Sequence, residues 1–494
     1  MKKPNVLFIM CDQFRFDAIA SLGNGIVKTP NIDRLVKRGI SFKNAYSTCP
    51  VCVPARYTIR TGSEPYSHGY FKNAGTVFTD KKTMEERCGD YIAKAMSKMG
   101  YYTFGIGKFH ACPYNEDLGY DYYAQSEELY VNMEQRNFDA YASFIADEHP
   151  EYSHIEQLHG ERTEMYYMPQ MSPLPADLTV EAWAAGVAKK QITQCKDKPY
   201  FGFVSFIGPH PPCAPPVPFN RIYNPDNIPN PVKGNIDIDH ADDFLPWMNY
   251  LIWAEDINDS HARVLKARYY GEITYIDTCI GKILDAVVET EDADNTLICF
   301  FSDHGDHLGD HHSWQKESFF DGSCRIPFIL SWPARFAGDT ENDALVSLAE
   351  LFSIATGATG NCITRDGIDI LGVLEGKAPQ RELIFGFHET PGTIWFKLMV
   401  KDKRYKYIYI ANGGRELLFD NINDKNEHID LSGKHPELTA KYRGIAVNKI
   451  TCNDNLSLAV ENNNLKQFEF SPYKRFRIHQ FDLSKGIKNF DDIF

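Results

Sequence analysis

Four nearly continuous apolar runs stand out along the chain, and each ends within a few residues of polar side chains. The runs are Val6 to Met10, Tyr101 to Ile106, Tyr200 to Ile207 and Thr296 to Phe301. Apolar runs without polar alternation are typical of parallel strands covered on both faces. Helical patterns lie over residues 85–99, 180–194 and 264–288. This alternation predicts an α/β fold with a large, mixed but mainly parallel sheet between helices.

The pattern changes after about residue 380, where the apolar runs become shorter. Strands are predicted from Trp395 to Val400, Tyr405 to Ile410 and Glu416 to Phe419, and a polar helix near 435–445. We therefore expect a large α/β domain over residues 1–379 and a small C-terminal subdomain of antiparallel strands with an extended tail over 380–494. Residues 112–180 are rich in Tyr and Glu. They form an insertion that either shapes a ligand pocket or is a surface excursion.

Polar residues come after each of the four apolar runs. They are Asp12 and Gln13, Lys108 and His110, His210, and Asp303 and His304. In open α/β sheets the ligand lies beyond the carboxyl ends of the strands, so these residues should converge on one site.

Four of these residues are candidate metal ligands: Asp12, Gln13, Asp303 and His304. Carboxylate and amide oxygens suit a hard cation, most simply Ca²⁺ or Mg²⁺, and the imidazole leaves Mn²⁺ open. Each aspartate taken alone could equally be a loop or cap residue.

Other histidine segments carry different expectations. Lys108 and His110 are two residues apart and point to one face of an extended segment, although the pair alone is typical of a surface lysine and a capping histidine. His307, His311 and His312 lie in a glycine-containing stretch without helical spacing, so we expect them to be solvated loop or rim groups.

The stretch Cys52-Val53-Pro54-Ala55-Arg56, with Thr61-Gly62 downstream, places a potential nucleophile where a helix should begin. Pro54 suits a first helical position, and the helix N-terminus with Arg56 would bind a tetrahedral oxyanion such as sulfate or phosphate. Three other interpretations of Cys52 remain open at this point: a redox pair with Cys49, half of a zinc site, and a buried structural cysteine.

Cys-x-Pro-x-Arg with a downstream Thr-Gly resembles the signature of the type I, formylglycine-dependent sulfatases of the alkaline-phosphatase-like superfamily. The resemblance covers roughly residues 4–430. It implies that Cys52 is oxidised to formylglycine, whose hydrate attacks sulfur with one hydroxyl and expels sulfate through the other. It also implies a divalent metal bound by the acidic residues after the strands together with the modified Cys52.

The same resemblance implies roles for further residues. Arg56, Lys108 and Lys316 would stabilise charge on the sulfuryl oxygens, His110 would act as the base for the formylglycine hydrate, and His210 would assist the leaving alcohol. Asn73 would contact the substrate. Gln13 departs from the family, where many members have a second aspartate, and this should weaken metal binding or change the preferred metal.

Composition sets the remaining limits. The 494-residue chain carries a net charge of −14 and has a pI of about 5.6, which argues against a nucleic-acid partner. Its twelve scattered cysteines indicate a reducing compartment. The first apolar run is too short for a signal peptide, and no membrane span is expected, so the sequence as it stands predicts a cytoplasmic protein, or a periplasmic one if a leader is missing.

The function expected from the sequence is hydrolysis of a sulfate ester, with a sulfated saccharide as substrate. The expected partner is a formylglycine-generating or anaerobic sulfatase-maturating enzyme. The alternatives are a phosphonate monoester or phosphodiester hydrolase of the same superfamily, and a non-catalytic protein that binds sulfated glycans.

Overall fold

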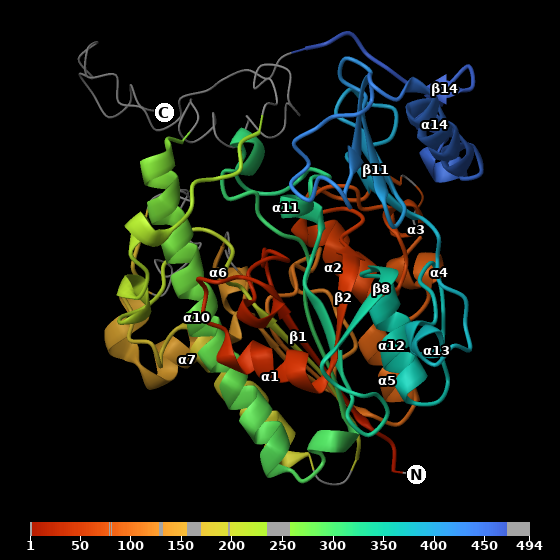
Figure 1. Ribbon diagram of the computed structural model, residues 1–494. Helices are drawn as coiled ribbons and strands as arrows, with labels where there is room; N and C mark the ends of the chain where they lie inside the picture. Colours follow the sequence, from red (N-terminus) through yellow and green to blue (C-terminus); the bar gives the residue numbers. More distant parts are fainter. Residues whose placement is uncertain are drawn as a thin grey trace.

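An eight-stranded sheet between two layers of helices forms the body of the protein, and a smaller four-stranded sheet lies at one end (Figure 1). The computed structural model describes residues 2–78, 80, 82–127, 132–155, 169–195, 198–234 and 257–471. Within these residues, no helix is both long and apolar enough to cross a membrane.

The large sheet is mixed but mainly parallel, as expected. In spatial order its strands are β4 (Tyr122–Gln125), β3 (Tyr102–Gly107), β5 (Tyr200–Phe206), β1 (Asn5–Cys11), β6 (Thr296–Ser302), β7 (Phe328–Ser331), β2 (Ile40–Tyr46) and β8 (Thr340–Ser347). Among these strands, β7 alone runs antiparallel to its neighbours. The four predicted runs are therefore β1, β3, β5 and β6, which lie side by side in the order β3-β5-β1-β6.

Helices cover both faces of this sheet. The described α-helices are α1 (Pro30–Arg38), α2 (Cys52–Thr61), α3 (Pro65–His68), α4 (Met84–Cys88), α5 (Ile92–Lys98), α6 (Met133–Arg136), α7 (Ala140–Glu148), α8 (Val180–Gln194), α10 (Asp259–Glu289), α11 (Asp321–Cys324), α12 (Glu350–Ala358), α13 (Ile370–Leu374) and α14 (Pro436–Thr451). Short 3-10 turns occupy Ala20–Leu22, Pro150–Ile155, Phe219–Arg221, Pro225–Asn227, Ala293–Asn295, Asp310–His312 and Asp454–Ala459. The helices α1, α8 and α10 pack on one face, and α5, α12 and α13 on the other.

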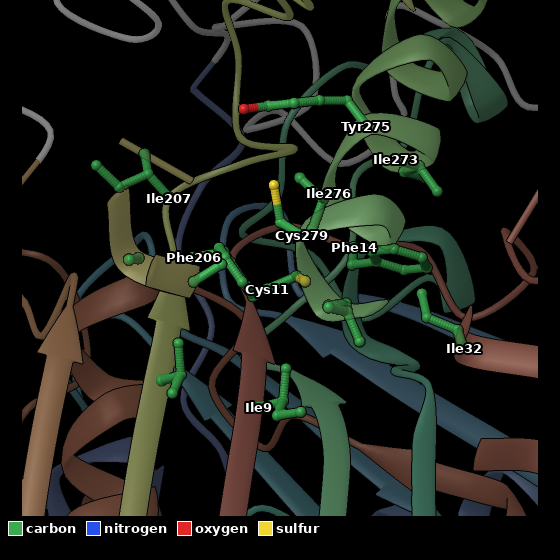
Figure 2. Packing of buried hydrophobic residues seen from close by; sticks show 14 of the residues in the cluster. Ile9, Cys11, Phe14, Ile32, Phe206, Ile207, Ile273, Tyr275, Ile276 and Cys279 are labelled. Atoms are coloured by element: carbon green, nitrogen blue, oxygen red, sulfur yellow. The ribbon is translucent and has the colours of Figure 1, made fainter. Parts of the chain in front are cut away.

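The central strand β1 is buried along its whole length because both of its faces meet helices. Ile9 and Cys11 point to the side on which Ile276 and Cys279 of α10 pack (Figure 2). Phe8 belongs to the apolar cluster on the opposite face. Alternation of side chains along a strand explains why a continuous apolar run was needed.

Two of the three predicted helices in the body are confirmed, and one is not continuous. Residues 180–194 form α8, and 264–288 lie inside the longer α10. The predicted helix over 85–99 is interrupted, because Gly89 takes a φ of 77° and ends α4 before α5 begins at Ile92.

The C-terminal part forms the predicted antiparallel sheet. Its strands adjoin one another in space as β12 (Arg415–Asp420), β11 (Tyr405–Ile410), β10 (Lys397–Lys401) and β9 (Ile384–His388), and a short hairpin joins β13 (Val460–Glu461) to β14 (Asn464–Leu465). Strand β9 was not predicted from the sequence. The expected insertion contributes β4 to the edge of the large sheet, whereas its residues 128–131 and 156–168 lie outside the described residues.

Candidate active site

The carboxyl ends of four neighbouring strands and the start of one helix bring the predicted residues together. Asp12 comes after β1, Lys108 after β3, His210 after β5 and a three-residue loop, and Asp303 after β6. Cys52 begins α2. All five are buried, so the sheet edge forms an enclosed site rather than an exposed patch.

Asp12, Cys52, Asp303 and His304 form a buried cluster whose candidate ligand atoms lie within 4.8 Å of one another. His304 Nδ1 faces the carbonyl of Gly305 at 3.0 Å, which can only accept a hydrogen bond. Nδ1 therefore carries the proton, and Nε2 is left facing Asp12 Oδ1 at 3.5 Å. Two carboxylates and an oriented imidazole are a donor set that fits a divalent cation.

Arg56 contacts both carboxylates of this cluster. Its Nε donates to Asp303 Oδ2 at 3.0 Å, and Nη2 donates to Asp12 Oδ2 at 2.8 Å. Nη1 donates to the backbone carbonyl of Lys108 and to Ser205 Oγ. These contacts orient the acidic pair and occupy most of the N–H groups of Arg56, whose expected contact with the sulfuryl oxygens stays a prediction.

Charge balance keeps Asp12 ionised. Burial and the neighbouring Cys52 raise its pKa, but Lys108 and Arg56 outweigh them and hold the pKa well below its usual range. Lys108 Nζ forms a fully buried ion pair with Asp12 Oδ2. Asp12 is thus a permanent anion at the end of β1.

Cys52 lies between the acidic cluster and the basic residues. Its Sγ is 3.3 Å from both His304 Nε2 and Lys316 Nζ. Burial raises the pKa of Cys52, but Lys316, Lys108, His304 and a hydrogen bond from His110 together lower it well below its usual value. The helix begins at Cys52 itself, so Pro54 occupies its first turn but not its first position.

The neighbourhood of Cys52 also argues against its interpretation as a redox pair with Cys49. Cys49 Sγ donates to the carbonyl of Phe71 at 3.4 Å, so the two thiols of the C-x-x-C have separate partners. None of the twelve cysteines, all of which lie among the described residues, forms a disulfide. Asn73 lies beside the site as expected, although it accepts from Val53 N at 3.0 Å, at the helix N-terminus.

Gln13 forms a hydrogen bond with Lys316, the second lysine of the site. Lys316 Nζ donates to Gln13 Oε1 at 2.7 Å, and Gln13 Nε2 donates to Asp306 and to Gln315 Oε1 at 3.1 Å. Burial lowers the pKa of Lys316, but Cys52, Asp12 and Asp303 raise it above its usual value, so this lysine is charged.

Two histidines face Cys52 from different strands. His110 hydrogen-bonds Cys52, and its backbone has a φ of 51°, so the segment after β3 is a turn and not the extended segment expected from the sequence. His210 Nδ1 faces the carbonyl of Pro211 at 2.8 Å, which leaves Nε2 for its hydrogen bond with Cys52. Burial, Lys316 and Lys108 lower the pKa of His210 to about 3.

Backbone strain is concentrated around these groups. Gln13, His110, Gln315 and Glu317 are non-glycine residues with φ between 51° and 73°. Such conformations persist only where the surroundings enforce them, and they gather at functional sites.

The expectation that His307 and His311 are solvated is wrong. Both are buried: His307 Nε2 pairs with Ser318 Oγ at 2.7 Å, and the His311 ring stacks on Phe320 with a centroid separation of 4.3 Å. Phe320, on which His311 stacks, packs in turn on Phe419 of β12, a long-range contact that loop composition alone could not indicate.

Sequence reasoning missed several supporting residues. Ser205 binds Arg56, Asp306 binds Gln13, and Glu127 accepts hydrogen bonds from the turn that carries His110. Ser205 and Asp306 lie close in sequence to predicted site residues, which is the signal that could have found them. Nothing in the sequence around Glu127 indicates its contact.

A buried cysteine at a helix N-terminus, between carboxylates on one side and lysines on the other, is an arrangement suited to binding a tetrahedral oxyanion together with a divalent cation. The sulfatase family model matches residues 4–361. The chain therefore belongs to the sulfatase family, and it is a sulfuric ester hydrolase.

Individual relatives support the same classification. An arylsulfatase of Clostridium perfringens is 27% identical over 447 residues, covering 87% of this chain and 90% of the relative. An ulvan-active sulfatase of Formosa agariphila is 27% identical over 453 residues, covering 87% of this chain and 78% of the relative. The phosphonate monoester hydrolase of Agrobacterium radiobacter shares the fold, with a TM-score of 0.75 at 23% identity over 94% of this chain and 100% of that chain.

Proposed function

We propose that this sulfatase hydrolyses the sulfate ester of a small sulfated carbohydrate, with a formylglycine made from Cys52 as nucleophile. The observation that carries the proposal is the position of Cys52 Sγ, 3.3 Å from His304 Nε2 on the acidic side and 3.3 Å from Lys316 Nζ on the basic side. An anionic ester attacked at this point has cations to bind its oxygens. The ulvan-active relative supports a saccharide as the substrate class.

Asp12, Asp303, His304 and the modified Cys52 would hold a divalent cation, with Gln13 as a further oxygen donor. We propose Ca²⁺ as the cation, with Mg²⁺ and Mn²⁺ as alternatives, because oxygen ligands of this kind suit all three. When bound, the cation supplies Lewis-acid stabilisation of the sulfuryl oxygens, and formylglycine supplies a hydrated aldehyde as nucleophile and sulfate carrier. Arg56 keeps both carboxylates directed toward the site.

Lys108 and Lys316 bind the sulfuryl oxygens in this proposal. Both are buried and directed at the cluster, so their charges act at low dielectric and are already oriented before substrate arrives. His110, in contact with residue 52, accepts the proton of the nucleophile's second hydroxyl.

His210 protonates the leaving alcohol. Its Nδ1 proton is engaged by Pro211, so Nε2 is the atom that faces the ester. Burial and two lysines lower the pKa of His210 to about 3 in the absence of substrate. An anionic sulfate ester beside those lysines offsets their effect and shifts this pKa upward, which is the direction that a general acid requires.

The fold shared with a phosphonate monoester hydrolase makes that activity, or phosphodiester hydrolysis, the second candidate. The Lys108 and His110 pair beside Cys52 favours sulfate, because the resemblance that predicted these residues belongs to sulfatases.

The maturation enzyme that modifies Cys52 and the cellular compartment of the protein are proposals as well. Conversion of Cys52 requires a formylglycine-generating or anaerobic sulfatase-maturating enzyme. The twelve scattered cysteines, none of which forms a disulfide, support a reducing and therefore cytoplasmic setting.

The test is ion chromatography of sulfate and phosphate released by protein co-expressed with a maturation enzyme. Sulfated monosaccharides, an aryl sulfate, a phosphonate monoester and a phosphodiester are offered in parallel. We expect sulfate release that Cys52→Ala abolishes and Cys49→Ala preserves, since Cys49 is equally buried but its thiol donates to the Phe71 carbonyl. Phosphorus-ester cleavage without sulfate release would replace the proposal with the second candidate. No turnover by protein whose formylglycine is verified by mass would refute both.

A further inference from the structure

Two arginine side chains donate hydrogen bonds to backbone carbonyls of the turn after β3, which spans Lys108 to His110. The carbonyl of Lys108 accepts from Arg56 Nη1, and the carbonyl of Phe109 accepts from Arg60 Nη2. Both arginines come from α2, the helix that begins at Cys52. The turn is therefore fixed to the nucleophile's own helix through its acceptor groups.

A carboxylate accepts hydrogen bonds from the backbone N–H groups of the same turn. Glu127 Oε1 accepts from Phe109 N at 2.9 Å and from His110 N at 2.8 Å. Gln125 Nε2 donates to the same oxygen at 3.0 Å. Consecutive backbone N–H groups that converge on one anion form a nest, a geometry that backbone of this kind adopts around negative charge.

The topology explains how Glu127 reaches the turn. Strand β4 runs parallel to β3 and ends at Gln125, and Ser126 N then donates to the carbonyl of Gly107 at 3.0 Å. The next residue, Glu127, lies directly beside the turn and is buried. It comes from the segment expected to be an insertion, which thus supplies part of the framework behind the site.

The positive φ of His110 indicates why the carboxylate of Glu127 is needed at this turn. A histidine with φ of 51° is held away from its preferred backbone conformation, and the strain must be balanced by contacts. The backbone N–H of His110 is held by Glu127. If the nest is lost, the turn can relax, and the His110 ring moves away from Cys52.

We propose that Glu127 is a positioning residue, whose carboxylate locks the Lys108–His110 turn so that Lys108 and His110 both face residue 52. The inference rests on the proposed function for the roles of those two side chains. Glu127 acts through the backbone, so its effect requires an acceptor oxygen at Oε1 rather than a titrating group.

Three variants of the matured enzyme test this inference. Glu127→Ala removes the acceptor, whereas Glu127→Gln keeps an oxygen acceptor without the charge. Asp121→Ala is the matched control, because Asp121 accepts from Thr103 N at 2.8 Å at the opposite end of the same strand pair. Formylglycine content is checked by mass for each variant before kcat and KM for sulfate release are compared.

We expect kcat to fall at least about tenfold in Glu127→Ala with KM changed less than about threefold, since a misplaced group acts on the chemical step. Glu127→Gln should recover most of kcat. Asp121→Ala should lower the melting temperature while leaving kcat near wild type below it. A Glu127→Ala enzyme that behaves like Asp121→Ala, or a Gln variant as damaged as the Ala variant, would overturn the proposal.

Hydrogen exchange separates this proposal from the proposed reaction. Peptides covering residues 107–112 should exchange faster in Glu127→Ala than in wild type, Glu127→Gln or Asp121→Ala. If wild-type protein releases no sulfate from any ester, the proposed function fails, while the exchange rates still test the role of Glu127. Unchanged exchange in Glu127→Ala shows that the carboxylate does not hold the turn.

Discussion

Asp12→Asn is the substitution that most directly probes the acidic cluster. Asp12 Oδ2 accepts hydrogen bonds from both Lys108 Nζ and Arg56 Nη2, and all three side chains are buried. Removal of this carboxylate leaves two buried cations facing a neutral amide, although Arg56 keeps its contact with Asp303. Breaking a buried ion pair in this way costs about 3–5 kcal/mol of unfolding free energy. At roughly 2 °C per kcal/mol for a chain of this size, the metal-free melting midpoint should fall by about 6–10 °C.

The same substitution removes one of the two carboxylates available to a cation. We expect the variant to lose bound metal and to release sulfate at least about a hundredfold more slowly than wild type. Metal content is measured by mass spectrometry of the digested protein. The melting midpoint is measured with added Ca²⁺ and with a chelator. Wild type should be stabilised by Ca²⁺, and Asp12→Asn should not respond.

Asp277→Asn is the matched control for Asp12→Asn. Asp277 is also fully buried, and it accepts from Ile32 N at 2.8 Å, which joins α10 to the start of α1 away from the active site. This variant should lose stability yet keep the Ca²⁺ response and activity. The assignment of Asp12 to the metal site is refuted if Asp12→Asn retains wild-type metal content and turnover, or if Asp277→Asn loses them equally.

Two further predictions concern stability. Burial lowers the pKa of Lys401 from its usual 10.5 to about 8, so below pH 8 the folded protein buries a charged ammonium at a cost of up to about 3 kcal/mol, which disappears as the pH rises from 8 to 10.5. Lys401→Met should therefore be more stable than wild type in urea unfolding at pH 7, with an advantage that shrinks at pH 9.5, and a pH-independent difference would contradict this. Gly107 has a φ of 94°, and an added Cβ would lie 2.0 Å from the carbonyl oxygen of Ser205, so Gly107→Ala should destabilise the fold by more than about 3 kcal/mol. Gly23→Ala, at a φ of 113° with open space around it, should cost only about 1 kcal/mol in the same denaturation assay, and equal losses would show that the contact with Ser205 is unimportant.

The sequence determined the framework because the framework depends on local periodicity. The apolar run of β1 and the helical pattern of α8 each arise from side-chain spacing within a few residues. The residues at the carboxyl ends of parallel strands meet at one edge of the sheet, so the convergence of Asp12, Lys108 and Asp303 could be predicted without knowing the strand order. Strand β9 was missed, because its short pattern mixes Phe, Gly and His.

Only the tertiary structure decided which partner each polar group has. Arg56 contacts Asp303 across 247 residues of sequence, and Lys316 contacts Gln13 across 303. Glu127 reaches the His110 turn because β4 lies beside β3, and no pattern in the sequence specifies that neighbour. A hydrogen bond is fixed by distance and direction between groups that folding brings together, whereas composition and spacing specify only which groups are available.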